Sequence, residues 1–351
     1  MKVLYAIQGT GNGHISRARE ILSHLGKFCD FDVLISAGDD SLDCGFPVKY
    51  RLKGITLKYN SGGGIDKLGT FYKNNIIQFY RDLKQLPIQD YDLVINDFEP
   101  VSAWACKWRN VPIIAMSHQS AYRSGACPRP RIRNHFGEFL FRWYAPTEHY
   151  YGFHFQSYSE HIKAPLIRSE VRDLKVENGS FNLVYLPSYS NLQLLKIFRH
   201  FPSQRFEIFC KIESRRRIGN CVFNPADQYV FLEKLRKCGA VICGAGFELP
   251  SESIYLGKRL LAIPIRGQYE QECNAEALRK MGVAVMRDLN YAGLNQWFRD
   301  SEAVAAPEVP DTEQFLTQVF NDLNKHTFLE KKLLQIDLGL SEYNKTQSIS
   351  I

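Results

Sequence analysis

The sequence predicts an α/β protein built from two Rossmann-like, doubly wound domains that face each other across a cleft. Two observations lead to this fold class. Short apolar runs alternate with amphipathic runs through the first 165 residues, and the same alternation begins again after a polar stretch at 168–180. Short apolar strands that alternate with helices are typical of a parallel sheet covered on both faces. With 351 residues, the chain is also long enough for two ordinary domains.

We expect an N-terminal domain at 1–165, a C-terminal domain at 166–325 and a helical segment at 326–351. The N-terminal domain begins with a strand at 2–7 and a helix at 14–27 that has one apolar face. Its further elements are predicted as strands at 31–36, 92–96 and 113–117, helices at 72–86 and 101–109, and a helix followed by a strand within 129–156.

The C-terminal domain repeats this order of elements. Its strands are predicted at 182–186, 206–211, 240–243, 259–263 and 283–286. Its helices are predicted at 192–201, 250–256, 270–281, 293–299, 312–323 and 329–340, with a further apolar segment at 231–237. Two successive units of this kind predict a ligand-binding cleft between the carboxyl edges of two sheets.

The composition describes an ordinary soluble globular protein, with 45% hydrophobic and 23% charged residues. No apolar run reaches the ~20 residues that span a bilayer, and the N-terminal MKVLYAIQG has the pattern of a first core strand. The nine cysteines have no paired spacing, which favours free thiols in a reducing cytoplasm and argues against a zinc site. The net charge of +7 suits an anionic ligand, an anionic membrane surface or a plain solvated surface. We expect no nucleic-acid partner.

The first predicted strand is followed by the loop sequence GTGNGH at residues 9–14. Its three glycines allow a sharp turn and let a ligand approach the next helix N-terminus, where unpaired N–H groups favour anions. The spacing matches neither the dinucleotide fingerprint GxGxxG nor a P-loop. Two acids after the second predicted strand, Asp39 and Asp40, still leave an NAD-dependent oxidoreductase as an alternative.

His14 stands at the end of this loop, where the helix begins. An imidazole titrates near neutral pH and suits a general base in a cleft, although a histidine here could also only cap or pack the helix start. Asp97 and Glu99 follow the strand at 92–96 at the usual ligand edge of a parallel sheet. One of these acids could orient His14 and stabilise its imidazolium; the alternative is plain helix capping, favoured for Glu99.

Polar residues also follow the later predicted strands. His118 and Gln119 come directly after the strand at 113–117, where they could contact a substrate or serve only in capping and packing. Between 240 and 282, a strand ends in a Gly-Ala-Gly turn before a helix, and a second strand leads to a loop rich in acids and amides. A helix N-terminus suits a phosphate, and neighbouring carboxylates and amides suit sugar hydroxyls. The alternative is a solvated helix start.

This last segment and the GTGNGH loop resemble the GT-B glycosyltransferases that use nucleotide sugars. The most similar families are the lipid-I N-acetylglucosaminyltransferase, the UDP-glucuronosyl- and plant glucosyltransferases, and their prokaryotic relatives. The resemblance covers most of the chain in the right order. It implies a GT-B fold with the acceptor in the N-terminal domain, the donor in the C-terminal domain, and final helices that cross back to the first domain.

The residues that match the family's donor site are Gly244, Gly246, Phe247, Glu252, Glu270, Gln271 and Asn274. In that family the glycine turn and helix start hold the diphosphate, the helix glutamate binds the ribose, and the acid–Gln pair before Asn-Ala binds sugar hydroxyls. One departure lies in the sequence YLPSYSN, where Ser188 and Ser190 stand where many relatives carry glycines and a serine. The Ser188 hydroxyl could supply a phosphate contact there.

The resemblance further implies an inverting transfer with His14 as the catalytic base and Asp97 as its partner. The residues expected to line the acceptor site are Gly11, Asn12, Gly13, Glu99, His118 and Gln119. UDP is the family's default nucleotide, and neither a metal nor a cofactor is expected. Alternatives are a catalytically inactive nucleotide-sugar-binding protein and a nucleotide-sugar epimerase, whose opening loop typically reads Gly-Thr-Arg-Pro-Glu.

The acceptor is expected to be a hydroxyl of a lipid or a glycan. The segment PRPRIRNHFGEFLFRWYAP, starting at Pro128, combines Arg129, Arg131 and Arg133 with many aromatic residues. Such a segment could touch an anionic membrane surface, which would make the protein cytoplasmic and peripheral at the inner face of the membrane. The alternative is an ordinary core helix with its arginines outside.

Overall fold

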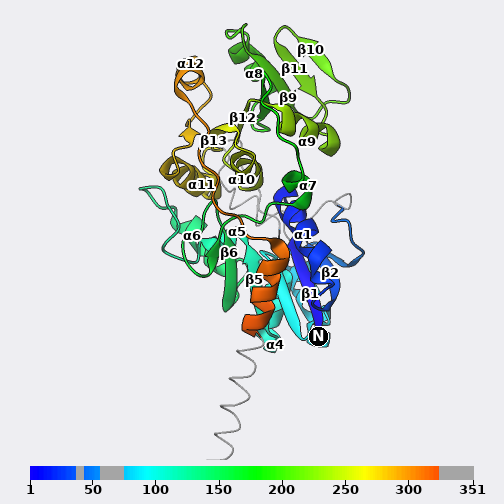
Figure 1. Cartoon of the computed structure of the whole chain (residues 1–351). Coiled ribbons are helices and arrows are strands. Elements are labelled where there is room, and N and C mark those ends of the chain that lie inside the picture. The colour runs from blue at the N-terminus through cyan, green and yellow to red at the C-terminus, as the bar shows by residue number, and fades with distance from the viewer. Residues whose placement is uncertain (37–42, 56–74, 324–351) are drawn as a thin grey trace, which may run out of the picture.

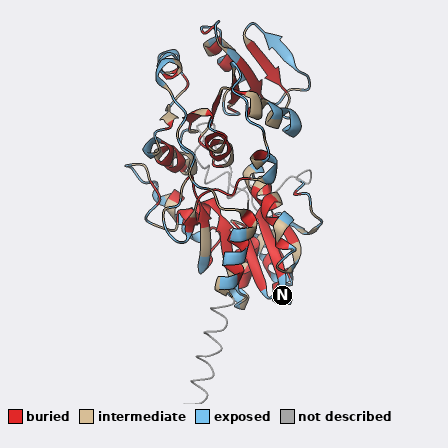
Figure 2. Cartoon of the chain, viewed as in Figure 1, coloured by how far each residue is buried: buried red, intermediate tan, exposed pale blue. Residues whose placement is uncertain are grey.

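The computed structural model describes residues 1–36, 43–55 and 75–323. Two seven-stranded sheets form the centres of two layered α/β units, one below the other in Figure 1. In both units the central strands are buried and the outward helix faces are exposed, whereas the edge strand of the second sheet at Arg216–Ile218 is exposed (Figure 2). The predicted fold class of two Rossmann-like domains is therefore confirmed.

The first sheet is wholly parallel and has the strand order β3-β2-β1-β4-β5-β6-β7. Its strands are β1 (Lys2–Gln8), β2 (Asp30–Ser36), β3 (Val48–Leu52), β4 (Leu93–Asp97), β5 (Ile113–Ser117), β6 (His149–Phe153) and β7 (Ile162–Lys163). The helices of this part are α1 (Asn12–Leu25), α3 (Ile76–Gln85), α4 (Pro100–Arg109), α5 (His118–Ala121) and α6 (His135–Trp143), with a short 3-10 helix at Ile88–Asp90.

Strand β1 shows why the first sheet is covered on both sides. Leu4 and Ala6 pack with residues of α3 and α4, whereas Val3, Tyr5 and Ile7 pack with the apolar face of α1. Alternate side chains of a strand point to opposite faces, so an uninterrupted apolar run must be covered twice. The apolar sequence of β1 therefore fixes its place in the middle of the sheet.

The second sheet has the order β10-β11-β9-β8-β12-β13-β14 and is parallel except for the edge pair β10–β11. Its strands are β8 (Phe181–Tyr185), β9 (Arg205–Phe209), β10 (Arg216–Ile218), β11 (Cys221–Asn224), β12 (Ala240–Gly244), β13 (Arg259–Ile263) and β14 (Ala284–Val285). The helices are α7 (Ser169–Arg172), α8 (Asn191–Phe198), α9 (Gln228–Lys237), α10 (Glu248–Tyr255), α11 (Tyr269–Lys280) and α12 (Tyr291–Asp300).

A helix at 312–323 returns to the first sheet, where Figure 1 shows it beside β5. The ring of Phe320 stacks on that of Phe28 with centroids 5.2 Å apart, and Thr312 donates a 2.7 Å hydrogen bond to the buried carboxylate of Glu20. The backbone N–H of Ser169 binds the same carboxylate at 2.8 Å. Glu20 on α1 thus anchors both chain segments that connect the two units. The expected segment at 326–351 lies outside the described residues.

Most predicted elements are found within a few residues of their expected bounds. Strands β3, β7, β10 and β11 and the short helices α5 and α7 were not predicted. Exposed residues interrupt the apolar pattern in β3 and β10, whereas β7, β11, α5 and α7 have only two to four residues each. The predicted helix at 72–86 corresponds to α3, although its first three residues lie outside the described ranges, as do Asp39, Asp40 and the predicted helix at 329–340.

The largest hydrophobic cluster is continuous between the two units. It joins Val3 and Ile95 of the first sheet, through Phe153 and Phe247, to Val241 of the second sheet. All nine cysteines are free thiols. Within the described ranges, no helix has both the length and the apolar character that crossing a membrane requires.

Candidate active site

Both sheets change direction at a switch point, where a neighbouring pair of strands sends its connections to opposite sides. In the first sheet this point lies between β1 and β4, and in the second sheet between β8 and β12. Ligands of open parallel sheets bind at the carboxyl ends of such strand pairs. His14 follows β1 and Asp97 ends β4, whereas Ser188 follows β8 and Gly244 ends β12. The fold therefore places predicted residues from both halves at the two switch points.

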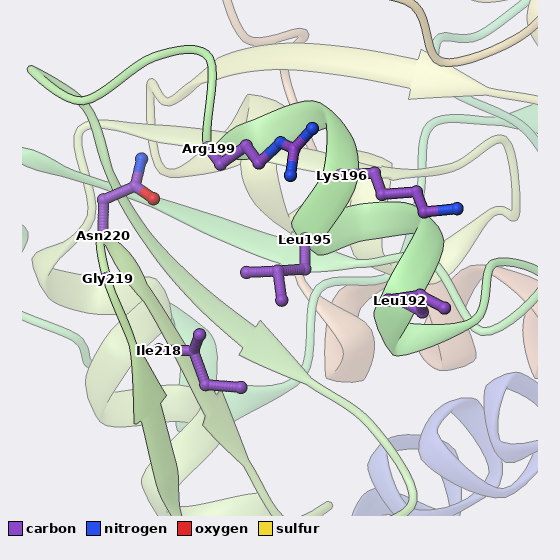
Figure 3. A pocket seen from close by; sticks show the side chains of 7 residues that line it. All are labelled: Leu192, Leu195, Lys196, Arg199, Ile218, Gly219 and Asn220. Carbon is purple, nitrogen blue, oxygen red and sulfur yellow. The ribbon is translucent and has the colours of Figure 1, made fainter.

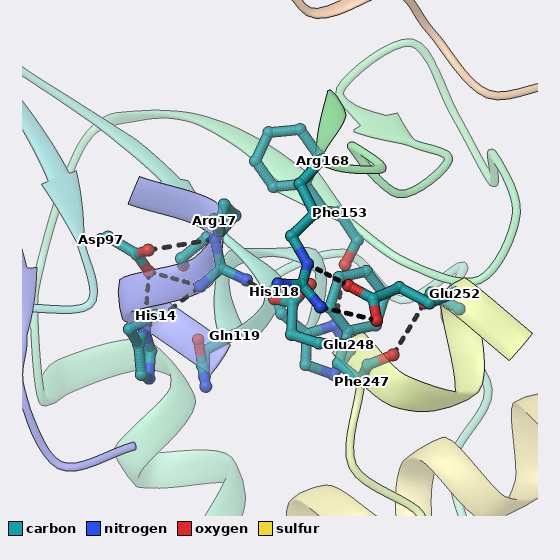
Figure 4. A network of polar contacts seen from close by, with 12 residues as sticks. His14, Arg17, Asp97, His118, Gln119, Phe153, Arg168, Phe247, Glu248 and Glu252 are labelled. Atoms are coloured by element: carbon teal, nitrogen blue, oxygen red, sulfur yellow. Dashed lines mark hydrogen bonds and ion pairs between the residues drawn. The ribbon is translucent and has the colours of Figure 1, made fainter. Parts of the chain in front are cut away.

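His14 and Asp97 are in direct contact (Figure 4). The Nδ1 atom of His14 lies 2.8 Å from Oδ1 of Asp97. Burial opposes ionisation of Asp97, but the nearby charges of Arg17 and His14 lower the pKa of its carboxyl below the usual value. An ionised carboxylate only accepts hydrogen bonds, so we assign the proton to Nδ1 of His14, which donates it to Asp97. Nη2 of Arg17 lies 3.1 Å from the same Nδ1 but donates over the shorter distance of 2.7 Å to Oδ1 of Asp97. Nε2 of His14 then has its lone pair free, and no described residue bonds to it.

Arg17 is a member of this cluster that sequence reasoning missed. It lies one turn after His14 on α1 and is buried, with 4% of its surface exposed. Its Nε and Nη2 atoms donate to the two oxygens of Asp97 at 3.0 and 2.7 Å. Its spacing in GHISRARE places it on the same helix face as His14, because residues at i and i+3 are neighbours on a helix, but this spacing does not indicate its contact with Asp97. Arg17 thus shares a face with the predicted base.

The same guanidinium reaches across to the second unit. Its Nη1 donates a 2.6 Å hydrogen bond to Oε1 of Glu248, the first residue of α10. Burial raises the pKa of Glu248 to about 7; Arg17 opposes this rise and the negative charges of Glu252 and Asp97 add to it. A Cβ atom on Gly13 would lie 3.1 Å from Cγ of Glu248, so glycine permits the close approach of α1 and α10.

The backbone of Phe98 is strained, and this residue directly follows Asp97. Its φ of 57° lies in the left-handed region, which costs a non-glycine residue about 1–2 kcal/mol. Its ring packs against Tyr144 with centroids 4.8 Å apart, and this packing holds the residue in place. The sharp turn after β4 is what leaves Asp97 at the very end of the strand.

Glu99, expected near the acceptor, is the N-cap of α4. Its two carboxylate oxygens accept hydrogen bonds from the backbone N–H groups of Val101 and Ser102 at 2.8 and 2.6 Å. The residue has no exposed surface, and burial raises the pKa of its carboxyl even though these bonds oppose the rise. We therefore assign Glu99 to helix capping and leave it out of the proposals below.

His118 is buried where the two units meet. Its Nδ1 lies 2.8 Å from the carbonyl oxygen of Phe153, and its Nε2 lies 2.8 Å from Oδ1 of Asn274. Its ring stacks on that of Phe247 at 4.1 Å, and burial lowers the pKa of the imidazole. A predicted acceptor residue thus touches two predicted donor residues directly.

Gln119 and Glu270 form a second bridge between the units. Nε2 of Gln119 donates to Oε2 of Glu270 at 3.0 Å, while Oε1 of Gln119 is buried without a hydrogen-bond partner among the described residues. Oε1 of Gln271 accepts a bond from the backbone N–H of Ile265 at 3.0 Å and so closes the loop before α11. Oε1 of Gln119 is thus a buried acceptor that the described residues leave unused.

Glu252 on α10 is paired with Arg168, a residue for which the sequence suggested no role. Nε and Nη2 of Arg168 donate to the two carboxylate oxygens of Glu252 at 2.6 and 3.1 Å (Figure 4). Arg168 lies in the connection between the units, just before α7. A carboxylate has about four lone-pair sites, so this pairing leaves Glu252 able to accept further hydrogen bonds.

Several of the helices at this junction begin without a side-chain cap. Within the described chain, the α-helices that begin without a side-chain cap are α1, α7, α10 and α11, whereas all others have one. Uncapped helix starts leave backbone N–H groups for other acceptors. Around α10, a Cβ atom on Gly246 would meet no atom within 4 Å, and Ser188 is exposed. This is an arrangement that can receive an anion.

Two hollows on the second unit contain none of the predicted residues. One, of about 380 Å³, is lined by Arg205, Arg215 and Arg217. The other, of about 260 Å³, lies between α8 and the β10–β11 turn and is lined by residues such as Leu192 and Ile218 (Figure 3). The chemistry-bearing side chains gather at the junction instead. Across residues 1–36, 43–55 and 75–323, no cluster of His, Cys, Asp and Glu is arranged to hold a metal ion.

The model of the family described as glycosyl transferase family 1 matches residues 1–300. No curated protein matches the sequence. Among solved structures, the glycosyltransferase SsfS6 of Streptomyces sp. SF2575 is 13% identical over 86% of this chain and 91% of its own, with a TM-score of 0.55. MurG of Acinetobacter baumannii is 14% identical over 92% and 99% of the two chains, also with a TM-score of 0.55.

A plant structure gives a third comparison. UGT2 of Phytolacca americana, complexed with UDP-2fluoro-glucose and pterostilbene, is 15% identical over 84% of this chain and 87% of its own, with a TM-score of 0.53. SsfS6 has also been solved with thymidine diphosphate. At these identities the likeness concerns the fold, which is the two-domain GT-B arrangement.

Proposed function

The chain belongs to glycosyl transferase family 1 and is an enzyme of the glycosyltransferase class, and we propose that it transfers a sugar with inversion, using His14 as the general base. The sugar comes from a nucleoside diphosphate sugar and goes to an acceptor hydroxyl. The observation that carries this proposal is the contact of 2.8 Å between Nδ1 of His14 and Oδ1 of Asp97. It leaves Nε2 of His14 free to accept a proton at the switch point of the first sheet.

In the proposed reaction, Nε2 of His14 removes the proton of the acceptor hydroxyl. The oxygen attacks the anomeric carbon from the side opposite the leaving group, and the bond from that carbon to the diphosphate oxygen breaks. Asp97 stabilises the imidazolium that forms, because its buried carboxylate is already bonded to Nδ1. The proton therefore resides on His14, and the electron pair of the broken bond leaves with the nucleoside diphosphate.

The donor site is proposed around the uncapped start of α10. The backbone at Gly244, Gly246 and Phe247 and the exposed Ser188 would hold the diphosphate, whose growing negative charge is favoured by a helix N-terminus. Glu252 would bind the ribose, and the residues proposed for the sugar hydroxyls are Glu270, Gln271 and Asn274. A uridine or a thymidine diphosphate donor is consistent with the ligands of the similar structures, and UDP is our first choice.

The acceptor is proposed to bind beside His14, in the space that the glycine loop leaves open. A Cβ atom on Gly11 would meet no atom within 4 Å, and Asn12 is exposed. Gly13 borders the same opening, and Gln119 carries the unpaired oxygen described above. These residues suit a hydroxyl-bearing acceptor more than an extended anionic one, because the guanidinium of Arg17 is already paired with the carboxylates of Asp97 and Glu248.

We further propose that the acceptor is carried on a lipid and that the enzyme touches a membrane. The segment at 128–146 exposes apolar side chains, with 86% of Ile132, 56% of Phe139 and 39% of Trp143 accessible, and its arginines Arg131 and Arg133 are also exposed. Exposed apolar and basic side chains on one segment suit the interface of an anionic bilayer. This would place the protein at the cytoplasmic face of a membrane.

The proposed donor site is tested by thermal unfolding in the presence of UDP-, GDP-, dTDP- and CMP-sugars. We expect at least one of them to raise the melting temperature of the protein, because a ligand that binds only the folded state stabilises it. The same panel is repeated on Glu252→Ala. A stabilisation that this variant retains in full would overturn the donor site, and stabilisation without any His14-dependent turnover would favour the inactive binding protein.

A further inference from the structure

Arg17 is the side chain that connects the proposed base to the opposite domain. Its Nε and Nη2 atoms donate to the two oxygens of Asp97, Nη2 also lies 3.1 Å from Nδ1 of His14, and Nη1 donates to Glu248 of α10. A bidentate pair between a guanidinium and a carboxylate fixes the plane of both groups. Arg17 is therefore in a position to control the geometry of Asp97 and, through it, of His14.

The hydrogen bonds of Asp97 show how strong this control is. His14 bonds to Oδ1 alone, whereas Arg17 bonds to both oxygens, and Nε of Arg17 is the partner recorded for Oδ2. A single bond from the imidazole would leave the carboxylate free to rotate about its own axis. The plane of the carboxylate, and with it the direction in which Nε2 of His14 points, follows from Arg17.

Charge gives Arg17 a second effect on Asp97. Asp97 has no exposed surface, and burial alone would favour its neutral form. Arg17 contributes the largest opposing influence, and His14 adds to it. The titratable and charged groups that face Asp97 are His14 and Arg17 on α1, Glu248 on α10 and the buried Tyr5 on β1. Arg17 is the permanent cation among them.

The contact with Glu248 makes this arrangement depend on the position of the second domain. Glu248 is the first residue of α10, and a Cβ atom on Gly13 would lie 3.1 Å from the Cγ atom of Glu248. Movement of α10 away from α1 would therefore break the bond to Nη1 and leave Arg17 held at Asp97 alone. The bond to Glu248 thus holds the far side of the guanidinium only while α1 and α10 lie together.

We propose that Arg17 is a positioning residue for the His14–Asp97 pair and that Glu248 anchors it from the opposite domain, so that the base is fully oriented only when the cleft is closed. This inference rests on the proposed role of His14 as the base. It adds a link between domain closure and proton transfer, carried by one side chain that contacts both domains.

The test compares the pH dependence of donor turnover in Arg17→Gln, Arg17→Lys and wild type, measured over a range of donor concentrations so that kcat and KM are obtained separately. Arg17→Gln removes the charge, and we expect kcat to fall about 10- to 100-fold while the KM for the donor changes little. Because Asp97 then loses its permanent cation, its pKa rises, and the acidic limb of the kcat profile moves to higher pH. This limb reports the coupled His14–Asp97 pair as a unit.

The lysine variant separates charge from geometry. Arg17→Lys keeps a cation beside Asp97, so the acidic limb stays near that of wild type, but kcat still falls because an ammonium cannot form the bidentate pair. Arg19→Gln is the matched control, since Arg19 lies on the same helix and bonds to Gln228 of the second domain without touching Asp97 or Glu248. We expect wild-type kinetics for this control.

Glu248→Gln tests whether Glu248 anchors Arg17. It also replaces Arg17→Gln in the test if that variant does not fold. We expect it to lower kcat about threefold to tenfold, with the acidic limb unchanged, because Arg17 still faces Asp97. An Arg17→Gln enzyme with a slower rate but an unmoved acidic limb would overturn the inference, as would full activity in both Arg17→Lys and Glu248→Gln. His14→Ala is run beside them: if it is inactive, such results refute only the role of Arg17, and if it keeps the wild-type rate, the proposed function itself fails.

Discussion

Nδ1 of His14 and Oδ1 of Asp97 lie 2.8 Å apart although 83 positions separate the two residues in the chain. The parallel pairing of β1 and β4 brings them together, because Ile7 of β1 is paired with Asp97 of β4. The loop that carries His14 therefore leaves the sheet directly beside the carboxylate. This relationship is the basis of the proposed mechanism.

Asp97→Asn should slow sugar transfer by about 10²- to 10⁴-fold without weakening donor binding. An amide can donate to Nδ1 and thereby stabilise the wrong tautomer of His14, and it cannot stabilise the imidazolium. The measurement is kcat from nucleoside diphosphate release, paired with the thermal shift that the donor produces. A variant that keeps more than half of the wild-type kcat would show that Asp97 does not assist the base.

Substitutions of Glu252 and of Arg168 are expected to have opposite effects on donor binding. Glu252→Gln should reduce the donor-induced rise in melting temperature, because an amide is a poorer partner for ribose hydroxyls than a carboxylate. Arg168→Gln should preserve or increase that rise, since it frees Glu252 from its bidentate partner. Both changes break a buried ion pair, so we expect the free energy of unfolding without donor to fall by about 3–5 kcal/mol. Equal donor shifts in the two variants would argue against a role of Glu252 in binding.

The sequence was sufficient to predict the residues whose positions follow from strand order. His14, Asp97, Gly244 and Ser188 all stand directly after apolar strands, and parallel strands bring such positions to one edge. Arg17 could not be assigned in this way, because a helical arginine is usually solvated. Its partners, Asp97 and Glu248, are 80 and 231 positions away, and local patterns do not report such distances.

Glu99 was expected near the acceptor, but it caps a helix. Glu99 has the same sequence context as Asp97, just after a buried strand, yet its side chain turns back to the start of α4. The difference depends on Phe98, whose left-handed backbone reverses the chain between the two acids. The sequence favoured capping for Glu99, but a positive φ at a phenylalanine has no signature in a single sequence, so the turn that separates the two acids required the structure.

Glu248 predicts a specific pH dependence of stability. Its pKa rises from 4.5 to about 7 in the folded protein, so the folded state holds this proton more tightly than the unfolded state. The contribution of Glu248 to the free energy of unfolding therefore falls as the pH rises from about 4.5 to about 7. Glu248→Gln removes this loss, and its free energy of unfolding relative to wild type should increase by up to about 3 kcal/mol across that range. Urea titrations at several pH values measure it.

The control for this experiment is Glu302→Gln, which changes an exposed acid of the second domain. Its difference from wild type should be the same at every pH in the range. If Glu248→Gln behaves in that way too, the carboxyl of Glu248 is not protonated near neutral pH, and the assignment of a raised pKa is wrong.

The exposed segment at 128–146 predicts binding to anionic vesicles. Wild type should sediment with phosphatidylglycerol-containing vesicles, and the double variant Ile132→Asp/Phe139→Asp should do so several-fold less, because it removes apolar side chains and adds repulsive charge. Tyr229→Asp is a suitable control, since Tyr229 is 86% exposed on the second domain. Equal sedimentation of wild type and the double variant would remove the support for a lipid-linked acceptor.

The most direct test of the central claim is the release of nucleoside diphosphate from the stabilising donor sugar, measured for wild type and His14→Ala under identical conditions. Donor hydrolysis by water is sufficient for this measurement, so it does not require knowledge of the acceptor. The account predicts that His14→Ala binds the donor with an unchanged thermal shift but turns it over about 10²- to 10⁴-fold more slowly. Turnover by His14→Ala at the wild-type rate would contradict it.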